Sequence, residues 1–280
     1  MNKTMLLNPF TNVVASGVAI CDLNNLLGVS LEAINLTLGG TFTKSNITLI
    51  QLKANGKVIF ETSGLFLDAI EQFKGYAADP NRLCINFMER SGRTINAFDS
   101  GSIDLSPQSG ITSLRLEVTT SGAVTPTLYG FAEVSPAVPI AGQEQLRWLM
   151  QRHHRIPFTV GAANVKTALP VPHIDPSGGG SVYKRIAFYS AYMTNIQIVR
   201  NGVVEFDGLV ADYNQMQRRA GRNPQTNLYV HDFVCDNIMS GRVWDTRPSA
   251  AVQQAIVYGT FSNTETIYVE TEELIPLSMY

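Results

Sequence analysis

Two stretches of the chain decide its fold: residues 48–61 read TLIQLKANGKVIFE, and residues 194–207 read TNIQIVRNGVVEFD. Aligned without gaps, the two stretches are identical at 7 of 14 positions, and Leu/Ile and Glu/Asp exchanges add two similar pairs. Similarity of this kind within one chain is the sequence signature of a repeated structural unit. The chain is therefore predicted to contain the same module twice.

Each stretch has the chemistry of a β-hairpin. A two-residue type I′ turn needs positive φ at both central residues, and Asn-Gly pairs supply it. We therefore expect Asn55-Gly56 and Asn201-Gly202 to define the two turns. Apolar residues alternate on both sides of each turn, as in half-buried strands. These residues are Leu49, Leu52, Val58 and Phe60 in the first copy and Ile196, Ile198, Val204 and Phe206 in the second.

A short helix is predicted directly after each hairpin. Residues 65–73 (LFLDAIEQF) and 209–217 (LVADYNQMQ) both place their apolar side chains on one helical face. Asp68 and Asp212 occupy the same position in the two copies. Arg218, Arg219 and Arg222 come at the end of the second helix, where cations interact favourably with the helix dipole.

Short β-rich segments surround each module, with turn signals between them. They give roughly eight strands and one helix in each half, a count typical of an eight-stranded antiparallel jelly roll. The predicted fold is therefore all-β with short helices: two tandem jelly-roll sandwiches, or a double jelly roll. The predicted strands are 12–21, 29–38, 83–88, 113–118 and 127–134, then 156–160, 182–192, 228–234, 255–260 and 264–271.

The two halves are predicted to be separate domains, residues 1–135 and 156–280, each of ordinary domain size. Residues 136–155 join them, and residues 141–154 are predicted to form a linker helix with Trp148 among its apolar anchors. Arg147, Arg152 and Arg155 lie in or beside this helix. Two interpretations of this basic cluster stay open: a structural seam between the domains, or a surface that faces anionic lipid headgroups.

Composition excludes several classes of protein. Hydrophobic residues make up 45% of the chain and charged residues 16%, which is incompatible with a disordered chain or a long coiled coil. The net charge of −2 argues against specific nucleic-acid binding. The three cysteines lie too far apart for a disulfide framework and are expected to be buried thiols. The sequence predicts no signal peptide and no transmembrane helix, so we expect a soluble protein made in a cytoplasm.

The search for catalytic or metal-binding motifs yields one candidate. There is no G-x-S-x-G sequence, the glycine run at 178–180 lacks the rest of a phosphate-binding loop, and His231 and Cys235 lack further zinc ligands at a fitting spacing. Glu270 and Glu272 would lie on one face of a strand and could bind a hard cation such as calcium. The alternative is an acidic edge that faces solvent or a protein lattice.

Tandem sandwiches, each with a hairpin followed by a helix and joined by a linker, resemble the double jelly-roll major capsid proteins. More narrowly, the chain is similar to the major coat protein of corticoviruses, the tailless icosahedral bacteriophages with an internal membrane. The resemblance extends over nearly the whole chain. It is carried by the paired Asn-Gly hairpins with their helices, the segment 148–155, and the closing strand segment 267–270.

This resemblance implies a structural role in the virion, with no enzymatic activity and no cofactor. Family members form homotrimers with a six-sided, pseudo-hexameric outline, which tile an icosahedral shell over a membrane. The implied partners are other copies of the chain, penton and minor membrane-associated capsid proteins, and lipid headgroups. Some relatives use calcium in the lattice. Synthesis and assembly would take place in the host cytoplasm.

Two other function classes compete with the capsid interpretation. Jelly rolls also occur in lectins, so a carbohydrate- or receptor-binding protein is the main alternative. Tyr183, Tyr189, Tyr192 and Tyr229 are its candidate sugar platforms, although the chain has only two tryptophans, Trp148 and Trp244. An enzyme of the cupin type would need a set of metal-binding histidines, and the four histidines here are dispersed.

Overall fold

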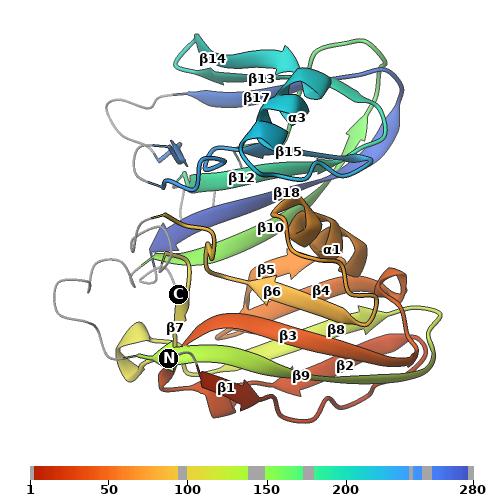
Figure 1. Ribbon diagram of the computed structural model, residues 1–280, viewed down its shortest axis with the longest axis vertical. Helices are drawn as coiled ribbons and strands as arrows, with labels where there is room; N and C mark the ends of the chain where they lie inside the picture. Colours follow the sequence, from red (N-terminus) through yellow and green to blue (C-terminus); the bar gives the residue numbers. More distant parts are fainter. Residues whose placement is uncertain are drawn as a thin grey trace. The chain divides into compact units, whose positions relative to one another are not determined.

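The computed structural model describes residues 3–93, 100–137, 149–172, 180–239, 242–247 and 254–276. These residues form many strands, three short 3-10 helices (Asn24–Leu26, Lys44–Asn46 and Pro107–Ser109) and two α-helices. The chain divides into two compact units (Figure 1). The first comprises residues 1–72, 76–153 and 274–280, and the second comprises residues 73–75 and 154–273.

The first unit has two antiparallel sheets. One has the order β1 (Lys3–Leu6), β9 (Val124–Pro136), β3 (Val29–Thr41) and β6 (Arg82–Asn86), with β7 (Ile103–Asp104) also paired to β3. The other belongs to a nine-stranded sheet, in which it has the order β5 (Lys57–Thr62), β4 (Ile47–Ala54), β8 (Leu114–Thr120) and β2 (Gly17–Asp22), with β10 (Leu149–Val160) next to β5.

Alternating side chains from the two sheets fill the core of the first unit. β8 shows the pattern most clearly, because Leu114, Leu116 and Val118 are buried and the residues between them are more exposed. The opposite sheet contributes Ile34 of β3 and Ile85 of β6 to the same cluster. A strand of period two with one apolar face thus explains why these segments form a sandwich.

The second unit repeats this arrangement. One sheet has the order β15 (Leu228–Asp232), β12 (Val182–Tyr189), β18 (Glu265–Pro276) and β10 (Leu149–Val160), with β16 (Trp244–Asp245) paired to β12. The other has the order β11 (Thr167–Ala168), β17 (Ala255–Phe261), β13 (Met193–Arg200) and β14 (Val203–Leu209).

The core of the second unit is richer in aromatic side chains than that of the first. Tyr183, Phe188, Tyr229 and Trp244 all lie in its buried cluster. Phe188 and Tyr229 face each other across the β12–β15 pair, with ring centroids 6.1 Å apart. Aromatic pairs at such distances add to the stability gained from burial.

A helix follows the same hairpin in both units. α1 (Gly64–Phe73) buries Phe66, Leu67 and Ile70, the one-sided spacing expected of an amphipathic helix. α3 (Val210–Arg219) instead docks through polar contacts: the Tyr213 hydroxyl donates to the Asp232 carbonyl at 3.1 Å. The side-chain amide of Gln217 donates to the Val230 carbonyl at 2.7 Å. Both predicted helices are therefore confirmed.

The predicted linker helix is wrong in its described part. Leu149–Val160 forms strand β10, and residues 141–148 of the predicted helix lie outside the described residues. β10 starts in the first unit and continues into the second after His153. His153 pairs in parallel with Phe60 of β5, and Met150 to His153 are all buried. Tertiary pairing of these residues outweighs the local helical spacing of their apolar side chains.

Candidate subunit-contact site

The turns of the two hairpins have the backbone conformation that their sequence demands. Asn55 and Gly56 have φ of 49° and 80°, and Asn201 and Gly202 have φ of 51° and 78°. A Cβ atom at either glycine would meet no atom within 4 Å. Backbone conformation, and not space, therefore favours glycine at these two positions.

The turn asparagines also hold the loop that precedes the next strand. The Asn55 side-chain oxygen accepts hydrogen bonds from the backbone N–H groups of Thr112 (2.9 Å) and Ser113 (3.2 Å). The Asn201 side-chain oxygen accepts one from the N–H of Gln254 at 3.1 Å. Local turn rules explain Asn at these positions. They could not predict the hydrogen bond to a distant residue, which in the second copy joins residues 53 positions apart in sequence.

The two hairpins differ in what covers their outer strand. In the first unit, Ile59 and Phe60 of β5 are 0% and 2% exposed, and His153 of β10 lies beside them. In the second unit, the counterparts Glu205 and Phe206 are exposed and half-buried, and Val203 and Val204, earlier in β14, are 65% and 50% exposed. β14 is the last strand of its sheet among the described residues. The same sequence module is thus a covered strand in one unit and an open edge in the other.

Further apolar side chains extend this open edge. Leu209, at the end of β14, and Met216, on α3, are 53% and 60% exposed. We call Val203, Val204, Leu209 and Met216 the β14–α3 surface. Exposed apolar side chains on an edge strand and the helix that follows it are typical of protein association. The β14–α3 surface is therefore a candidate contact between subunits.

The first unit has an exposed apolar edge of its own. Leu6 of β1 is 79% exposed, and it pairs with Phe131 of β9. Tyr129, two residues earlier in β9 and on the same face of the sheet, is 62% exposed. β1 is the last strand of this sheet within the described parts of the chain. It is a second candidate for contact with another copy.

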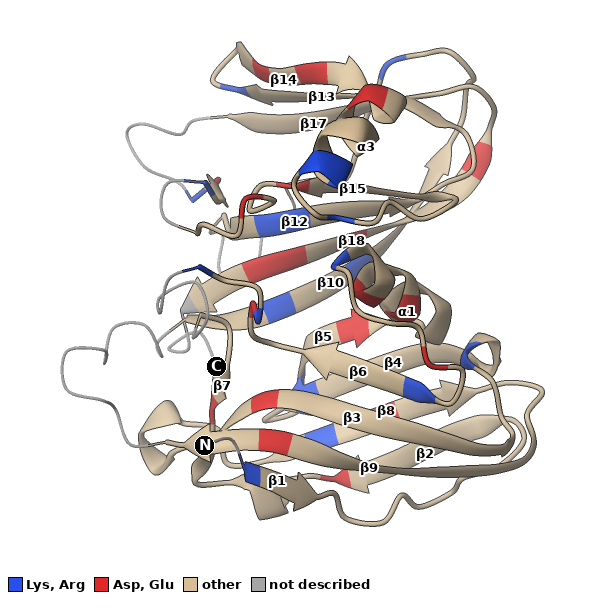
Figure 2. Ribbon diagram, in the orientation of Figure 1, with Lys and Arg blue, Asp and Glu red and all other residues tan. Residues whose placement is uncertain are grey.

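The second unit contains a buried chain of ion pairs. Arg185 of β12 is 1% exposed; its side chain lies 3.1 Å from Asp232 and 2.7 Å from Glu272. Asp232 also pairs with Arg222 at 2.7 Å, and Glu272 pairs with Lys74 at 2.6 Å. Figure 2 shows basic residues on β12 and acidic residues on β18. Arg222, expected at a helix end, is instead a buried member of this network.

Glu270 and Glu272 do not form the exposed acidic edge that the sequence suggested. They are 1% and 4% exposed. Glu270 lies 3.3 Å from the Arg155 guanidinium, and Glu272 is held between Arg185 and Lys74. Protein cations thus balance both carboxylates. Among the residues that the structure describes, no group of three or more His, Cys, Asp or Glu side chains is arranged to hold a metal ion.

The basic cluster around the predicted linker is not an exposed surface in its described part. Arg152 is 3% exposed, and Arg155 packs its guanidinium 3.8 Å above the Tyr268 ring beside Glu270. Neither side chain is placed to meet a lipid headgroup. Arg147 and Trp148 lie outside the described residues.

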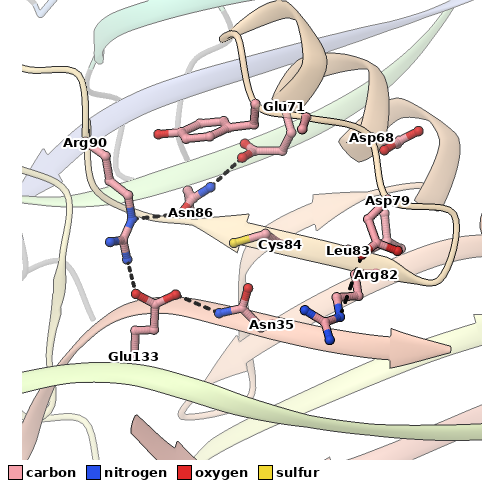
Figure 3. A pocket seen from close by; sticks show the side chains of 12 residues that line it. Asn35, Asp68, Glu71, Asp79, Arg82, Leu83, Cys84, Asn86, Arg90 and Glu133 are labelled. Atoms are coloured by element: carbon pink, nitrogen blue, oxygen red, sulfur yellow. Dashed lines mark hydrogen bonds and ion pairs between the residues drawn. The ribbon is translucent and has the colours of Figure 1, made fainter. Parts of the chain in front are cut away.

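The first unit has a polar pocket of about 280 Å³ between α1 and the outer face of β6, β3 and β9 (Figure 3). Glu133 accepts hydrogen bonds from Arg90 at 2.6 Å and from Asn35 at 2.8 Å. On the α1 side, Glu71 accepts from Asn86. The carboxylates of Glu133 and Glu71 are thus hydrogen-bonded to neighbouring side chains of the pocket.

His231 is part of an aromatic cluster. It stacks on Tyr213 with ring centroids 4.7 Å apart, and Phe206 and Phe233 contact it edge-on at 4.8 Å and 4.7 Å. Burial lowers the pKa of His231 to about 3, so its ring is neutral near pH 7. Its Nδ1 lies 3.2 Å from the Tyr229 hydroxyl. These contacts give His231 a packing role in the core.

The three cysteines are free thiols. Cys21 is buried, and burial raises its pKa to about 11, which keeps the thiol protonated. Cys84 and Cys235 are half-buried, so the expectation of three fully buried thiols holds only for Cys21.

Comparison with known protein families shows to which family the chain belongs. A family described as the viral coat protein P2 N-terminal domain matches residues 4–135, and the viral coat protein P2 C-terminal domain matches residues 152–277. The chain belongs to the viral coat protein P2 family. It is a viral structural protein, a major capsid protein, and its place is in the shell of the virion.

Solved structures share the fold of this coat protein over its whole length. The major capsid protein P2 of bacteriophage PM2 aligns with a TM-score of 0.82 and 15% identity, covering 98% of this chain and 97% of that one. The STIV MCP aligns with a TM-score of 0.72 and 14% identity, covering 99% and 97%. A chain of the Sulfolobus Turreted Icosahedral Virus aligns with a TM-score of 0.68 and 14% identity, covering 98% and 91%. The predicted double jelly roll is confirmed.

No curated protein has significant sequence similarity to the coat protein. In the described part of the chain, neither helix has the length and apolar character needed to cross a bilayer.

The carbohydrate-binding alternative gains nothing from the positions of the tyrosines. Tyr183 and Tyr229 are buried in the second core, and Trp244 is 3% exposed. Tyr189 and Tyr192 are 39% and 40% exposed. Half of the candidate sugar platform is therefore core, and the family match favours the capsid role.

Proposed function

We propose that the coat protein forms homotrimers with a six-sided outline and that these trimers tile an icosahedral shell. The main support is the internal duplication: each unit is a two-sheet sandwich with an Asn-Gly hairpin followed by a helix. Three copies of a two-unit chain place six similar sandwiches around one axis. Contacts between such copies are heterologous, and a three-fold rotation closes them into a ring.

The proposed role is structural and not catalytic. The carboxylates that line the pocket of the first unit are hydrogen-bonded to neighbouring side chains, and His231 is held neutral in an aromatic core. The ionic network of the second unit is buried and would stiffen a shell subunit without contacting a substrate. Its members are the kind of groups that specify a unique packing.

We further propose that the shell encloses a membrane and contacts penton and minor membrane-associated capsid proteins. The support is the similarity to corticovirus coat proteins. Lipid contact would involve residues other than Arg152 and Arg155, since Arg152 is buried and Arg155 is half-buried against Tyr268 and Glu270. Lipid extraction and phosphate analysis of purified virions test this part. Virions with no lipid would contradict it and leave the trimer proposal intact.

Light scattering of the purified chain during size-exclusion chromatography tests the trimer. A species of 3 × 30.7 kDa, or about 92 kDa, is expected. Two-dimensional class averages by electron microscopy should show particles with a six-sided outline. A monomer of 30.7 kDa at all protein concentrations and salt conditions would contradict the proposal.

A further inference from the structure

The duplication extends to the first strand of each unit. Residues 9–11 and residues 157–159 both read Pro-Phe-Thr. β1, just before the first of these, is the neighbour of β9, and β10, which contains the second, is the neighbour of β18. β9 and β18 are in turn the last long strands of their units. β1 and β10 therefore occupy equivalent places, and the alignment makes Met5 the counterpart of His153.

In the first unit, His153 lies against β5, the outer strand of the first hairpin. His153 pairs in parallel with Phe60 of β5, and its ring stacks on the Phe60 ring with centroids 4.8 Å apart. Its Nδ1 lies 2.7 Å from the Glu61 carbonyl oxygen. The first residues of β10, the first strand of the second unit, thus pair with β5, the outer strand of the first hairpin.

The counterparts of both partners lie on edge strands, and their side chains are half-buried. Phe206 is the counterpart of Phe60, and its strand β14 is the open edge that exposes Val203 and Val204. Met5, the counterpart of His153, lies on β1, which is an edge strand with Leu6 79% exposed. Each of these edge strands can accept a further strand through its backbone.

Open edges with exposed valines invite strand addition, and natural proteins protect them. β14 has seven residues, and neither a proline nor a lysine interrupts it. A capsid protein must also meet its neighbours in a fixed geometry, and backbone pairing between edges supplies both affinity and register. The internal β5–β10 pair shows which strand geometry this module accepts.

We propose that β1 of one subunit pairs in parallel with β14 of the next subunit, as β10 does with β5 within the chain. This inference rests on the proposed trimer and names the contact that builds it. Transfer of the His153–Phe60 register places Met5 beside Phe206 and Lys3 beside Val204. Repeated three times, this heterologous contact closes a ring.

The charges along the two edges are complementary. β1 carries Lys3 and no acidic residue, whereas β14 carries Glu205 and Asp207, both exposed. In the proposed register, Lys3 lies next to the residue that precedes Glu205. Lys3 and Glu205 would meet at a partly desolvated interface, where charges of opposite sign fix the register more than they add affinity.

Lysine substitutions at the two edges test the contact. Val204→Lys and Leu6→Lys each place a charge on an exposed side chain of a proposed edge, so the subunit should fold in both cases. Val165→Lys is the matched control, because Val165 is 50% exposed like Val204 but lies outside both edges. Light scattering should give about 92 kDa for the wild type and the control (3 × 30.7 kDa) and 30.7 kDa for the two edge variants.

A disulfide tests the register directly. Neighbouring strands lie about 4.8 Å apart, within the range of Cα separations that a disulfide spans. The double variant Lys3→Cys with Val204→Cys should form covalent trimers on oxidation, seen as 92 kDa bands in non-reducing electrophoresis (3 × 30.7 kDa). The mismatched pair Lys3→Cys with Val165→Cys controls for Cys21, Cys84, Cys235 and random contact and should stay at the monomer mass.

The outcomes separate the two proposals. A monomeric wild type overturns the trimer itself. A trimeric wild type whose edge variants remain trimeric, and whose matched cysteine pair cross-links no better than the mismatched pair, overturns the β1–β14 contact alone. Cross-linking at the matched pair together with monomeric lysine variants supports it.

Discussion

The imidazole ring of His153 stacks on the phenyl ring of Phe60, with ring centroids 4.8 Å apart and planes 26° from parallel. The same histidine lies 2.7 Å from the Glu61 carbonyl oxygen through Nδ1. One side chain thus fixes the start of β10 to the outer strand of the first hairpin. This contact covers the edge of β5, whereas the corresponding strand of the second unit, β14, is an open edge among the described residues.

Removal of this side chain should weaken the first unit. His153→Ala eliminates an aromatic contact and a hydrogen bond, which together predict a loss of about 1–3 kcal/mol in the free energy of unfolding. Urea unfolding followed by circular dichroism measures it. Val165→Ala, at an exposed side chain, should change the free energy by less than about 0.5 kcal/mol. Equal stability of both variants would show that the His153 contact contributes nothing.

The turn asparagines should show a graded response to substitution. Asn55→Asp keeps the oxygen that accepts from Thr112 and Ser113, Asn55→Gly keeps only the backbone freedom, and Asn55→Val loses both. The thermal unfolding midpoint should fall in that order. Asn201→Asp, Asn201→Gly and Asn201→Val should repeat the order in the second unit. A Val variant as stable as the wild type would contradict the role of the positive-φ turn.

The buried network predicts a large effect at Arg185. Arg185→Ala leaves Asp232 and Glu272 buried without their shared partner, so a loss of about 3–5 kcal/mol is expected. The matched control is Arg247→Ala, which breaks an exposed pair with Asp245 and should cost at most about 1 kcal/mol. Urea unfolding followed by the fluorescence of Trp244, buried in the same unit, reports the difference. Similar losses for the two variants would rule out an energetic role for burial of the network.

His231 predicts a pH dependence of known sign. Its pKa is about 3 in the folded chain and about 6.5 when unfolded, so below pH 6.5 only the unfolded state takes up this proton. The contribution of His231 to stability is therefore complete above pH 6.5 and declines, by about 1.4 kcal/mol per pH unit, as the pH falls toward 3. His231→Phe should remove this component of the slope between pH 6.5 and 5 in urea unfolding. An unchanged slope would mean that His231 titrates normally in the fold.

Local patterns were sufficient to predict the fold because each pattern occurs twice in the chain and the two copies support each other. Asn55-Gly56 and Asn201-Gly202 each predict a hairpin, and their agreement fixes the register of both copies. The strand predicted at 113–118 and observed at Leu114–Thr120 shows how well strict alternation marks a sandwich strand. β1, β7, β11 and β16 were missed, since strands of two to four residues carry too little periodicity.

The environment of side chains could not be predicted in the same way. Glu272 and Arg185 are 87 residues apart in sequence, and only the fold brings them together in the buried network. The helix predicted at 141–154 failed for a related reason: the burial of residues 150–153 depends on partners such as Phe60, far away in sequence. Phe60 is 2% exposed and its counterpart Phe206 is half-buried, a difference that likewise arises from the neighbouring strands and not from the repeated residue itself.

Electron cryomicroscopy of shells assembled from this coat protein tests the central claim most directly. We expect capsomers with three-fold symmetry and a six-sided outline, each built from three chains whose two sandwich units occupy alternate corners. Density for six separate chains in a capsomer, or for single chains that do not associate around a three-fold axis, would contradict it.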